Sequence, residues 1–173
     1  MDIKSKIRTV PHWPIKGVMF RDITTILQDS DAFRYVVDEL YNRYKNKKID
    51  KVVGIESRGF IFGSVLAYKL NAGFVPVRKK GKLPYKTLTE EFEKEYGKDI
   101  VEIHLDSINK GDNVLVVDDL IATGGTVSAA LRLVERLGGN IVECAFVIGL
   151  PDLKAMEKLK GYNLFTMVNF QGE

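Results

Sequence analysis

The sequence predicts a single α/β domain built on a mainly parallel sheet flanked by helices. Continuous runs of β-branched residues and leucine, bounded by turn residues, are typical of strands buried on both faces; residues 51–55, 114–117 and 141–150 contain such runs. Stretches with helical spacing alternate with these strands, which implies parallel pairing through right-handed crossovers. A length of 173 residues suits one domain with a sizeable core.

Composition and charge narrow the class of protein. The net charge is only +3 and the signs are interspersed, so nucleic-acid binding is not indicated. Cys144 is alone, which excludes a disulfide framework and fits a reducing cytoplasm. Residues 1–15 carry charges without an apolar core, and no apolar run approaches the ~20 residues of a spanning helix. We therefore expect a cytoplasmic protein with no membrane partner.

The N-terminal third begins irregularly and then becomes helical. Two prolines and a glycine in residues 9–27 argue against a continuous helix there. Residues 31–47 place apolar side chains at helical spacing, with Ser30 or Asp31 as the expected N-cap. The interpretation is an irregular entry segment followed by a helix that covers the sheet.

The middle of the chain predicts two strands and a long polar connection. Residues 51–55 form the first strand, and a helix from about residue 61 to 70 leads to a second strand at 74–78. Pro76 fits an edge strand or a position with an unpaired N–H. Residues 83–98 are polar without a stable apolar stripe, which is typical of a lid.

The last third continues the alternation. Residues 99–105 alternate as in a half-buried strand, and a buried strand at 114–117 follows. The next helix is expected to end at Gly138 and Gly139, which are good C-cap residues. The remaining elements are a strand at 141–150, a short helix at 153–159 and a strand at 164–168.

The densest functional signal follows the strand at 114–117. Two carboxylates, Asp118 and Asp119, come first, and in parallel sheets ligands bind beyond the carboxyl ends of strands. The loop then supplies small and hydroxyl residues before a helix starts: Ala122, Thr123, Gly124, Gly125 and Thr126. Such a loop lets backbone N–H groups approach an anion, while the carboxylates accept bonds from two vicinal ribose hydroxyls. A sugar phosphate needs both; the alternative is a capped turn with no ligand.

Two rival phosphate motifs are absent from the sequence. A Walker-type loop needs Gly-Lys-Ser/Thr, and neither Gly81-Lys82-Leu83 nor Gly97-Lys98-Asp99 supplies it. A dinucleotide fingerprint needs a third glycine in register with Gly124 and Gly125.

The stretch from 114 to 128 resembles the phosphoribosyl diphosphate (PRPP) motif of the type I phosphoribosyltransferases, in which a hydrophobic strand leads to Asp-Asp and Ala-Thr-Gly-Gly-Thr. The resemblance implies that family's fold, with an N-terminal hood at about 1–30 and a flexible lid loop at about 79–98. It also implies a homodimer and Mg²⁺ that arrives on PRPP, with no side-chain metal site.

Residues 17–23 resemble the base-binding segment of the adenine-specific members. This implies that Phe20 stacks on the purine, that the main chain near Met19 and Arg21 reads its edge, and that Leu120 also contacts adenine. Aromatic stacking is worth about 1–3 kcal/mol but hardly distinguishes bases. Two positions depart from the expected Asp and Pro of that segment, namely His12 and Lys16.

The resemblance also assigns residues to the pyrophosphate and the lid. The loop Glu56-Ser57-Arg58 is expected to hold pyrophosphate through an unusual cis peptide at or next to Glu56–Ser57, and Arg78 and Lys82 match further pyrophosphate contacts. In the lid, Glu95-Tyr96-Gly97 implies that Glu95 exchanges a proton at N7 while Tyr96 closes over the sugar and base. Glu95 and Arg58 are thus the expected catalytic residues. The plainer alternatives are a surface salt bridge for Arg58 and a solvated acidic run around Glu95.

The implied activity is the reaction of adenine with PRPP to give AMP and pyrophosphate. Two alternatives stay open: a phosphoribosyltransferase for another purine base, and a non-catalytic regulator that senses PRPP.

Overall fold

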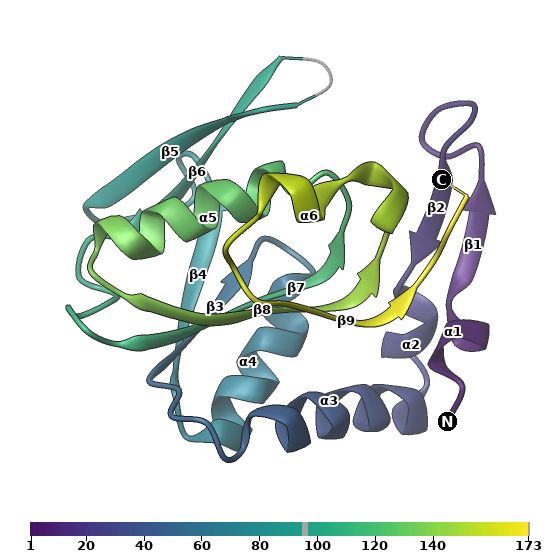
Figure 1. The fold of residues 1–173 in the computed structure, drawn as a ribbon, viewed down its shortest axis with the longest axis horizontal. Coiled ribbons are helices and arrows are strands. Elements are labelled where there is room, and N and C mark those ends of the chain that lie inside the picture. The colour runs from purple at the N-terminus through teal and green to yellow at the C-terminus, as the bar shows by residue number, and fades with distance from the viewer. Residues whose placement is uncertain (95–96, 173) are drawn as a thin grey trace.

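A seven-stranded sheet forms the centre of the computed structural model, which describes residues 1–94 and 97–172. Its order is β5-β6-β4-β3-β7-β8-β9 (Figure 1). The strands are β3 (Lys51–Ile55), β4 (Gly73–Lys79), β5 (Thr87–Glu93), β6 (Lys98–His104), β7 (Asn113–Ile121), β8 (Asn140–Gly149) and β9 (Leu164–Asn169). Strands β4, β3, β7, β8 and β9 are neighbours in this order and pair in parallel. Strand β6 pairs antiparallel with β4 and with β5. The mainly parallel sheet predicted from the sequence is confirmed.

Helices cover both faces of this sheet (Figure 1). Helices α3 (Ser30–Tyr44) and α4 (Gly59–Leu70) lie on one face, and α5 (Gly125–Arg136) and α6 (Ala155–Lys158) on the other. A short 3-10 turn, η1 (Pro151–Leu153), precedes α6. Each face has its own core, so the strands between them are buried on both sides. This explains the continuous apolar runs in the sequence.

A small hairpin stands beside β9 and forms the hood (Figure 1). It consists of β1 (Arg8–Pro11) and β2 (Met19–Asp22), with the short helices α1 (Ile3–Lys6) and α2 (Thr24–Leu27) at its base. The Trp13 ring packs edge-on against Phe20 at 4.4 Å between centroids, although Trp13 remains 51% exposed. The irregular segment expected from its prolines is therefore a hairpin.

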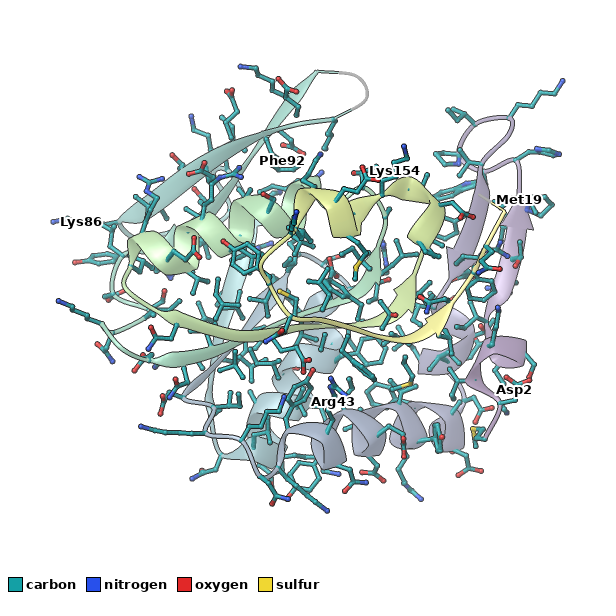
Figure 2. All side chains as sticks on the ribbon, viewed as in Figure 1. Asp2, Met19, Arg43, Lys86, Phe92 and Lys154 are labelled. Carbon is teal, nitrogen blue, oxygen red and sulfur yellow. The ribbon has the colours of Figure 1, made fainter. Side chains whose placement is uncertain are left out.

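The first long helix begins one residue earlier than expected. Asp29 is the N-cap, because its carboxylate accepts the N–H groups of Asp31 and Ala32, both at 3.1 Å. Neither Ser30 nor Asp31 caps α3, so that expectation is wrong. On the same helix, Arg43 points toward the sheet (Figure 2), where it pairs with Glu143 of β8 at 2.7 Å.

The end of α5 follows the expected glycine C-cap. Gly138 has a left-handed backbone with φ +90°, and its N–H donates to the Glu135 carbonyl at 2.9 Å. The Gly139 N–H donates to the Val134 carbonyl at 3.0 Å, which completes a Schellman motif.

Pro76 lies in an interior strand, yet at a position that tolerates proline. Strand β4 pairs with β3 along five residues, whereas its register with β6 covers only Arg78 and Lys79. Pro76 therefore sits where β3 is the registered partner, and the expectation of an unpaired N–H position fits better than that of an edge strand.

The expectation of a polar loop at 83–98 is wrong for residues 87–93. These residues form β5, which pairs with β6 over seven positions as a long hairpin that projects beyond the sheet (Figure 1). Leu88, Glu90 and Phe92 share one face of β5, and Phe92 is 8% exposed. An alternation with a glutamate at its centre gives only a weak apolar stripe, which is why the sequence suggested a loop.

No helix of the described ranges is both long and apolar enough to cross a membrane.

Candidate active site

A cavity of about 240 Å³ opens at the carboxyl ends of β3 and β7. It is lined by residues of the β3 and β7 ends, the following loop and the start of α5: Ile55, Glu56, Arg58, Asp118, Asp119, Leu120, Ile121, Ala122, Thr123, Gly124, Gly125, Thr126 and Val127. The predicted ribose and phosphate residues, and Leu120 of the predicted adenine set, thus lie around one space. Ile55, Ile121 and Val127 were not expected; their apolar character gave no signal beyond that of core residues.

The two aspartates are part of the central strand itself. Strand β7 continues through both of them to Ile121, beyond the expected end at Val117, because its pairing with β8 continues to Gly149. Successive side chains therefore point to opposite faces. Asp119 is 2% exposed, and its carboxylate lies 2.5 Å from Nε of Arg58.

The surroundings of Asp118 change its pKa. Burial raises the pKa of Asp118 well above its ordinary value, and the neighbouring Asp119 charge adds to the rise. The Asp118 carboxylate accepts the Asp119 N–H at 2.8 Å, and Arg58 opposes part of the shift. Asp118 is thus a carboxyl that takes up a proton more readily than a free aspartate.

The loop after β7 lets the backbone come close to a ligand. Gly124 is the N-cap of α5 and has a left-handed backbone with φ +77°. A Cβ on Gly125 would lie 3.2 Å from the Glu93 carbonyl oxygen of β5. The first turn of a helix leaves N–H groups without intrahelical acceptors, so the glycine-rich start of α5 suits a phosphate.

The loop after β3 contains a cis peptide bond between Glu56 and Ser57, at the expected place. The Glu56 carboxylate accepts the Lys79 N–H at 2.9 Å and pairs with Arg78 at 3.0 Å. Arg78 also donates to the Lys82 carbonyl at 3.2 Å. Ser57, Arg78 and Lys82 do not line the 240 Å³ cavity, and Arg78 and Lys82 belong to a neighbouring group at the β4 end.

The hood residues are placed differently from Leu120. Met19, Phe20 and Arg21 do not line the cavity. Phe20 packs under Trp13, and the Arg21 guanidinium lies over the Phe170 ring at 4.3 Å. Burial acts to lower the pKa of Arg58, but the Asp119 carboxylate raises it above its ordinary value. The charge of Asp22 makes a smaller contribution in the same direction. The end of β2 is thus electrostatically coupled to the cavity.

Two expected lid residues, Glu95 and Tyr96, lie outside the described residues.

Sequence reasoning missed Glu102. Its alternation on β6 suggested a side chain on the less buried face, but Glu102 is 3% exposed. No local pattern in the sequence marks Glu102, because only the β4–β6 register, in which Glu102 is opposite Arg78, brings it to the turn after β4.

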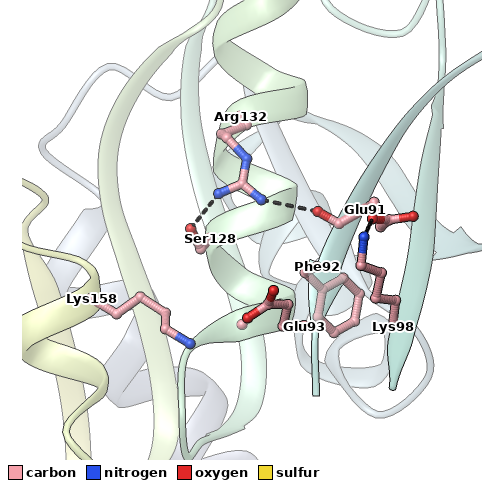
Figure 3. A pocket seen from close by; sticks show the side chains of 8 residues that line it. Glu91, Phe92, Glu93, Lys98, Ser128, Arg132 and Lys158 are labelled. Atoms are coloured by element: carbon pink, nitrogen blue, oxygen red, sulfur yellow. Dashed lines mark hydrogen bonds and ion pairs between the residues drawn. The ribbon is translucent and has the colours of Figure 1, made fainter. Parts of the chain in front are cut away.

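A second, larger cavity of about 520 Å³ lies between the β5–β6 hairpin, α5 and α6 (Figure 3). Most of its charged lining is already paired: Arg132 donates to the Ser128 hydroxyl at 2.8 Å, and Lys98 pairs with Glu91 at 2.6 Å. It does not reach Asp118 or Asp119, so the smaller cavity is the better candidate site.

In residues 1–94 and 97–172, no three His, Cys, Asp or Glu side chains lie close enough together to hold a metal ion. Glu56 and Asp119, two carboxylates of the cavity, already face Arg78 and Arg58. These residues fit a cation that enters with an anionic substrate.

Residues 23–172 match the family model of the phosphoribosyl transferase domain. This is the class of protein that the sheet, the paired aspartates and the phosphate loop define. The match covers the whole of the central sheet.

Similar proteins narrow the class further. An adenine phosphoribosyltransferase of Desulfosudis oleivorans is 61% identical over 173 residues and covers 100% of both chains. Among solved structures, the enzyme of that name from Thermoanaerobacter pseudethanolicus is 47% identical with a TM-score of 0.95 and covers 98% of both chains. The one from Saccharomyces cerevisiae, solved with an imino-altritol bisphosphate and adenine, is 43% identical with a TM-score of 0.91, covering 96% of this chain and 97% of that one. The chain belongs to the adenine phosphoribosyltransferase family.

Proposed function

We propose that this protein transfers the 5-phosphoribosyl group of PRPP to N9 of adenine, giving AMP and pyrophosphate in purine salvage. The observation that carries the proposal is the single cavity in which Asp118, Asp119 and the phosphate loop 122–126 meet. Family membership supplies the acceptor base, because the similar proteins are adenine phosphoribosyltransferases. Neither another purine base nor a regulatory role is favoured by these similarities.

The ribose 5-phosphate of PRPP would occupy the 240 Å³ cavity. Asp118 and Asp119 would accept hydrogen bonds from the ribose hydroxyls, and the loop N–H groups with Thr123 and Thr126 would hold the 5′-phosphate. The short Arg58–Asp119 pair supports this arrangement, because it fixes Asp119 before substrate binds.

The pyrophosphate would lie toward the loop after β3. Glu56 and Ser57 would contribute their loop, while Arg58, Arg78 and Lys82 would stabilise the charge of the leaving group. Mg²⁺ carried by PRPP would neutralise part of the pyrophosphate charge when it is bound. In this arrangement Arg58 exchanges part of its contact with Asp119 for a substrate oxygen.

Adenine would bind between the hood and the β7 end. Phe20 would stack on the base, the main chain of Met19 and Arg21 would read its edge, and Leu120 would pack against it. Glu95 would manage the proton at N7 and Tyr96 would close over the sugar and base. The transfer passes through an oxocarbenium-like transition state, in which the Asp118 and Asp119 charges lie near the developing cation.

The lid and the assembly are part of the proposal. Closure of the segment at about 79–98 would exclude water, which otherwise hydrolyses PRPP. We also propose a homodimer in the cytoplasm. Exposed Ile61 and Tyr68, seven residues apart on α4, form an apolar stripe that supports an interface, with Tyr68 86% exposed. Sedimentation of a 19.5 kDa species at all concentrations would refute the dimer.

The decisive assay is pyrophosphate release with PRPP and Mg²⁺, with adenine, hypoxanthine, guanine and xanthine offered in parallel. We expect release with adenine alone. Release with an oxopurine would preserve the PRPP site and overturn the hood as an adenine reader. PRPP binding without release for any base would instead support the regulatory alternative.

A further inference from the structure

A buried carboxylate on β6 organises the turn after β4, which carries Lys82 and contacts Arg78, two of the cations proposed for pyrophosphate. Glu102 is 3% exposed, and its Oε1 atom accepts the N–H of Lys82 at 2.9 Å and the N–H of Leu83 at 2.8 Å. Two consecutive backbone donors on one carboxylate oxygen define a small anion nest whose occupant is a side chain.

Hydrogen bonds to the Glu102 carboxylate lower its pKa by more than burial raises it. Burial acts to raise the pKa of Glu102, but N–H groups of Leu83, Gly81 and Lys82 and the Thr87 hydroxyl lower it below its ordinary value. Glu102 is therefore a carboxylate held in its charged form by the backbone of the turn at 79–83.

The turn connects this carboxylate to the candidate active site. The Arg78 guanidinium donates to the Lys82 carbonyl at 3.2 Å and pairs with Glu56 at 3.0 Å. Glu56 in turn accepts the Lys79 N–H at 2.9 Å, and it lines the 240 Å³ cavity. A continuous set of contacts thus runs from Glu102 through the turn and Arg78 to the cavity wall.

In residues 1–94 and 97–172, Glu102 is the side chain that accepts the Lys82 and Leu83 N–H groups, and the Lys82 N–H also donates to the Lys79 carbonyl at 3.2 Å. Gly81 has a left-handed backbone with φ +84°, which glycine adopts readily and which makes the turn tight. Without the carboxylate, the Leu83 N–H would lose this acceptor and the Lys82 N–H would keep the Lys79 carbonyl, so the Lys82 side chain would be held less firmly in place.

We propose that Glu102 is a positioning residue for phosphoribosyl transfer, which acts by fixing the turn at 79–83 so that Arg78 and Lys82 face the pyrophosphate of PRPP. This inference rests on the proposed function. It predicts a defect that is specific to PRPP and pyrophosphate, since the base and ribose contacts lie elsewhere.

The test compares Glu102→Leu, Glu102→Gln and wild-type protein. Leucine keeps the volume without an acceptor, so we expect the KM for PRPP to rise about tenfold or more while the KM for adenine stays within twofold. Glutamine keeps one acceptor oxygen, so it should restore the KM for PRPP to within about threefold of wild type.

The matched control is Glu143→Leu. Glu143 is also a buried glutamate, 6% exposed, but it pairs with Arg43 of α3 and Lys47, away from the cavity. This variant should lower the melting temperature without separating the two KM values. An equal change of both KM values in Glu102→Leu, or a PRPP-specific defect in Glu143→Leu, would overturn the positioning role.

Two readouts do not depend on the assigned reaction. Hydrogen exchange of the Lys82 and Leu83 amides should accelerate at least tenfold in Glu102→Leu and not in Glu143→Leu. Calorimetric titration with pyrophosphate and Mg²⁺ should show weaker binding by Glu102→Leu.

If wild-type protein is inactive with adenine and PRPP, the proposed function fails. Unchanged amide exchange and unchanged pyrophosphate affinity, by contrast, would refute the role of Glu102. If Glu102→Leu does not fold, the same two readouts on Glu102→Met, which also lacks the carboxylate, decide the question: amide exchange and pyrophosphate affinity equal to wild type would refute the role of Glu102.

Discussion

Asp118 combines a cost to the stability of the fold with a proposed role in ribose binding. A carboxyl whose pKa is raised on folding destabilises the folded state as pH rises above its unfolded pKa of 3.8. The sequence Asp-Asp at a buried strand end therefore opposes stability at neutral pH, as functional polar groups often do.

Asp118→Asn should separate stability from activity. Removal of the buried charge should raise the melting temperature at pH 7 by about 2–5 °C, while kcat/KM for PRPP falls at least about tenfold. Calorimetry and the pyrophosphate assay measure the two effects. Asp106→Asn, an exposed position on a turn, is the control and should change neither. A variant as active as wild type would remove Asp118 from the ribose site.

Phe20 is the residue through which the hood is proposed to contact the base. Phe20→Ala should raise the KM for adenine about tenfold and leave that for PRPP unchanged, because stacking is worth about 1–3 kcal/mol. Trp13→Ala is the informative comparison, since Trp13 packs against Phe20 at 4.4 Å and is half exposed. If Phe20→Ala weakened PRPP instead, the assignment of the hood would be wrong.

At the scale of elements, a cross-strand ion pair stabilises the hood hairpin. Asp22 pairs with Arg8, its opposite residue in the β1–β2 register, at 2.5 Å, and accepts the Thr24 hydroxyl at 2.7 Å. The Thr24 hydroxyl is the largest cause that lowers the pKa of Asp22 from 3.8 to about 2, with Arg8 contributing.

A lowered carboxyl pKa gives stability that is present above pH 3.8 and lost as pH falls through about 2. Asp22→Asn should therefore cost about 1 kcal/mol at pH 7, and the difference from wild type should vanish near pH 2. Urea unfolding at both pH values tests this. Asp2→Asn, at the exposed N-cap of α1, is the control variant. A difference from wild type that stays constant with pH for Asp22→Asn would contradict the assignment.

The β5–β6 hairpin is held on α5 by one glutamate and two arginines. Glu90 pairs with Arg132 at 2.7 Å and with Arg136 at 2.8 Å. Glu90 is the middle residue of β5, so these contacts fix the centre of this strand on α5.

Glu90→Gln should loosen this attachment. Exposed pairs contribute about 0.2–1 kcal/mol each, so the β5 amides should exchange about threefold to tenfold faster. Hydrogen-exchange mass spectrometry measures the change. Glu91→Gln removes only the exposed pair with Lys98 and serves as the control. Equal protection in both variants would show that the Glu90 carboxylate does not hold the hairpin on α5.

At the scale of the whole molecule, the site depends on how closely α4 approaches the central strand. A Cβ on Gly59 would lie 2.7 Å from the Val117 carbonyl oxygen and 2.9 Å from Oδ1 of Asp118. The neighbouring atoms belong to the backbone of a central strand, which cannot shift without moving its partners on both sides.

Gly59→Ala should destabilise the protein, although alanine favours helices by about 1 kcal/mol over glycine. Overpacking costs typically about 1–3 kcal/mol, so we expect a net loss of stability together with weaker PRPP binding, because Asp118 is displaced. Chemical unfolding and the kinetic assay test both. Ser64→Ala, at an exposed position on the same helix, should be neutral; a stabilised, fully active Gly59→Ala would refute the close approach.

The sequence by itself determined the sheet, most of its strands and the glycine-rich loop after β7, because each depends on local patterns. Apolar runs such as 51–55 and 114–117 must be buried on both faces, and Gly138 must end a helix. The paired aspartates and the loop after them were recognisable for the same reason: their chemistry is contiguous in the chain.

Only the tertiary structure decided which distant residues meet. The Arg58–Asp119 pair joins residues 61 positions apart, and Glu102 reaches the turn at Lys82 and Leu83 across two strands. Strand β5 forms because β6 and α5 lie beside it, which no local pattern in 83–98 indicates. Contacts of this kind depend on the register and crossing of whole elements, and a single sequence does not state these.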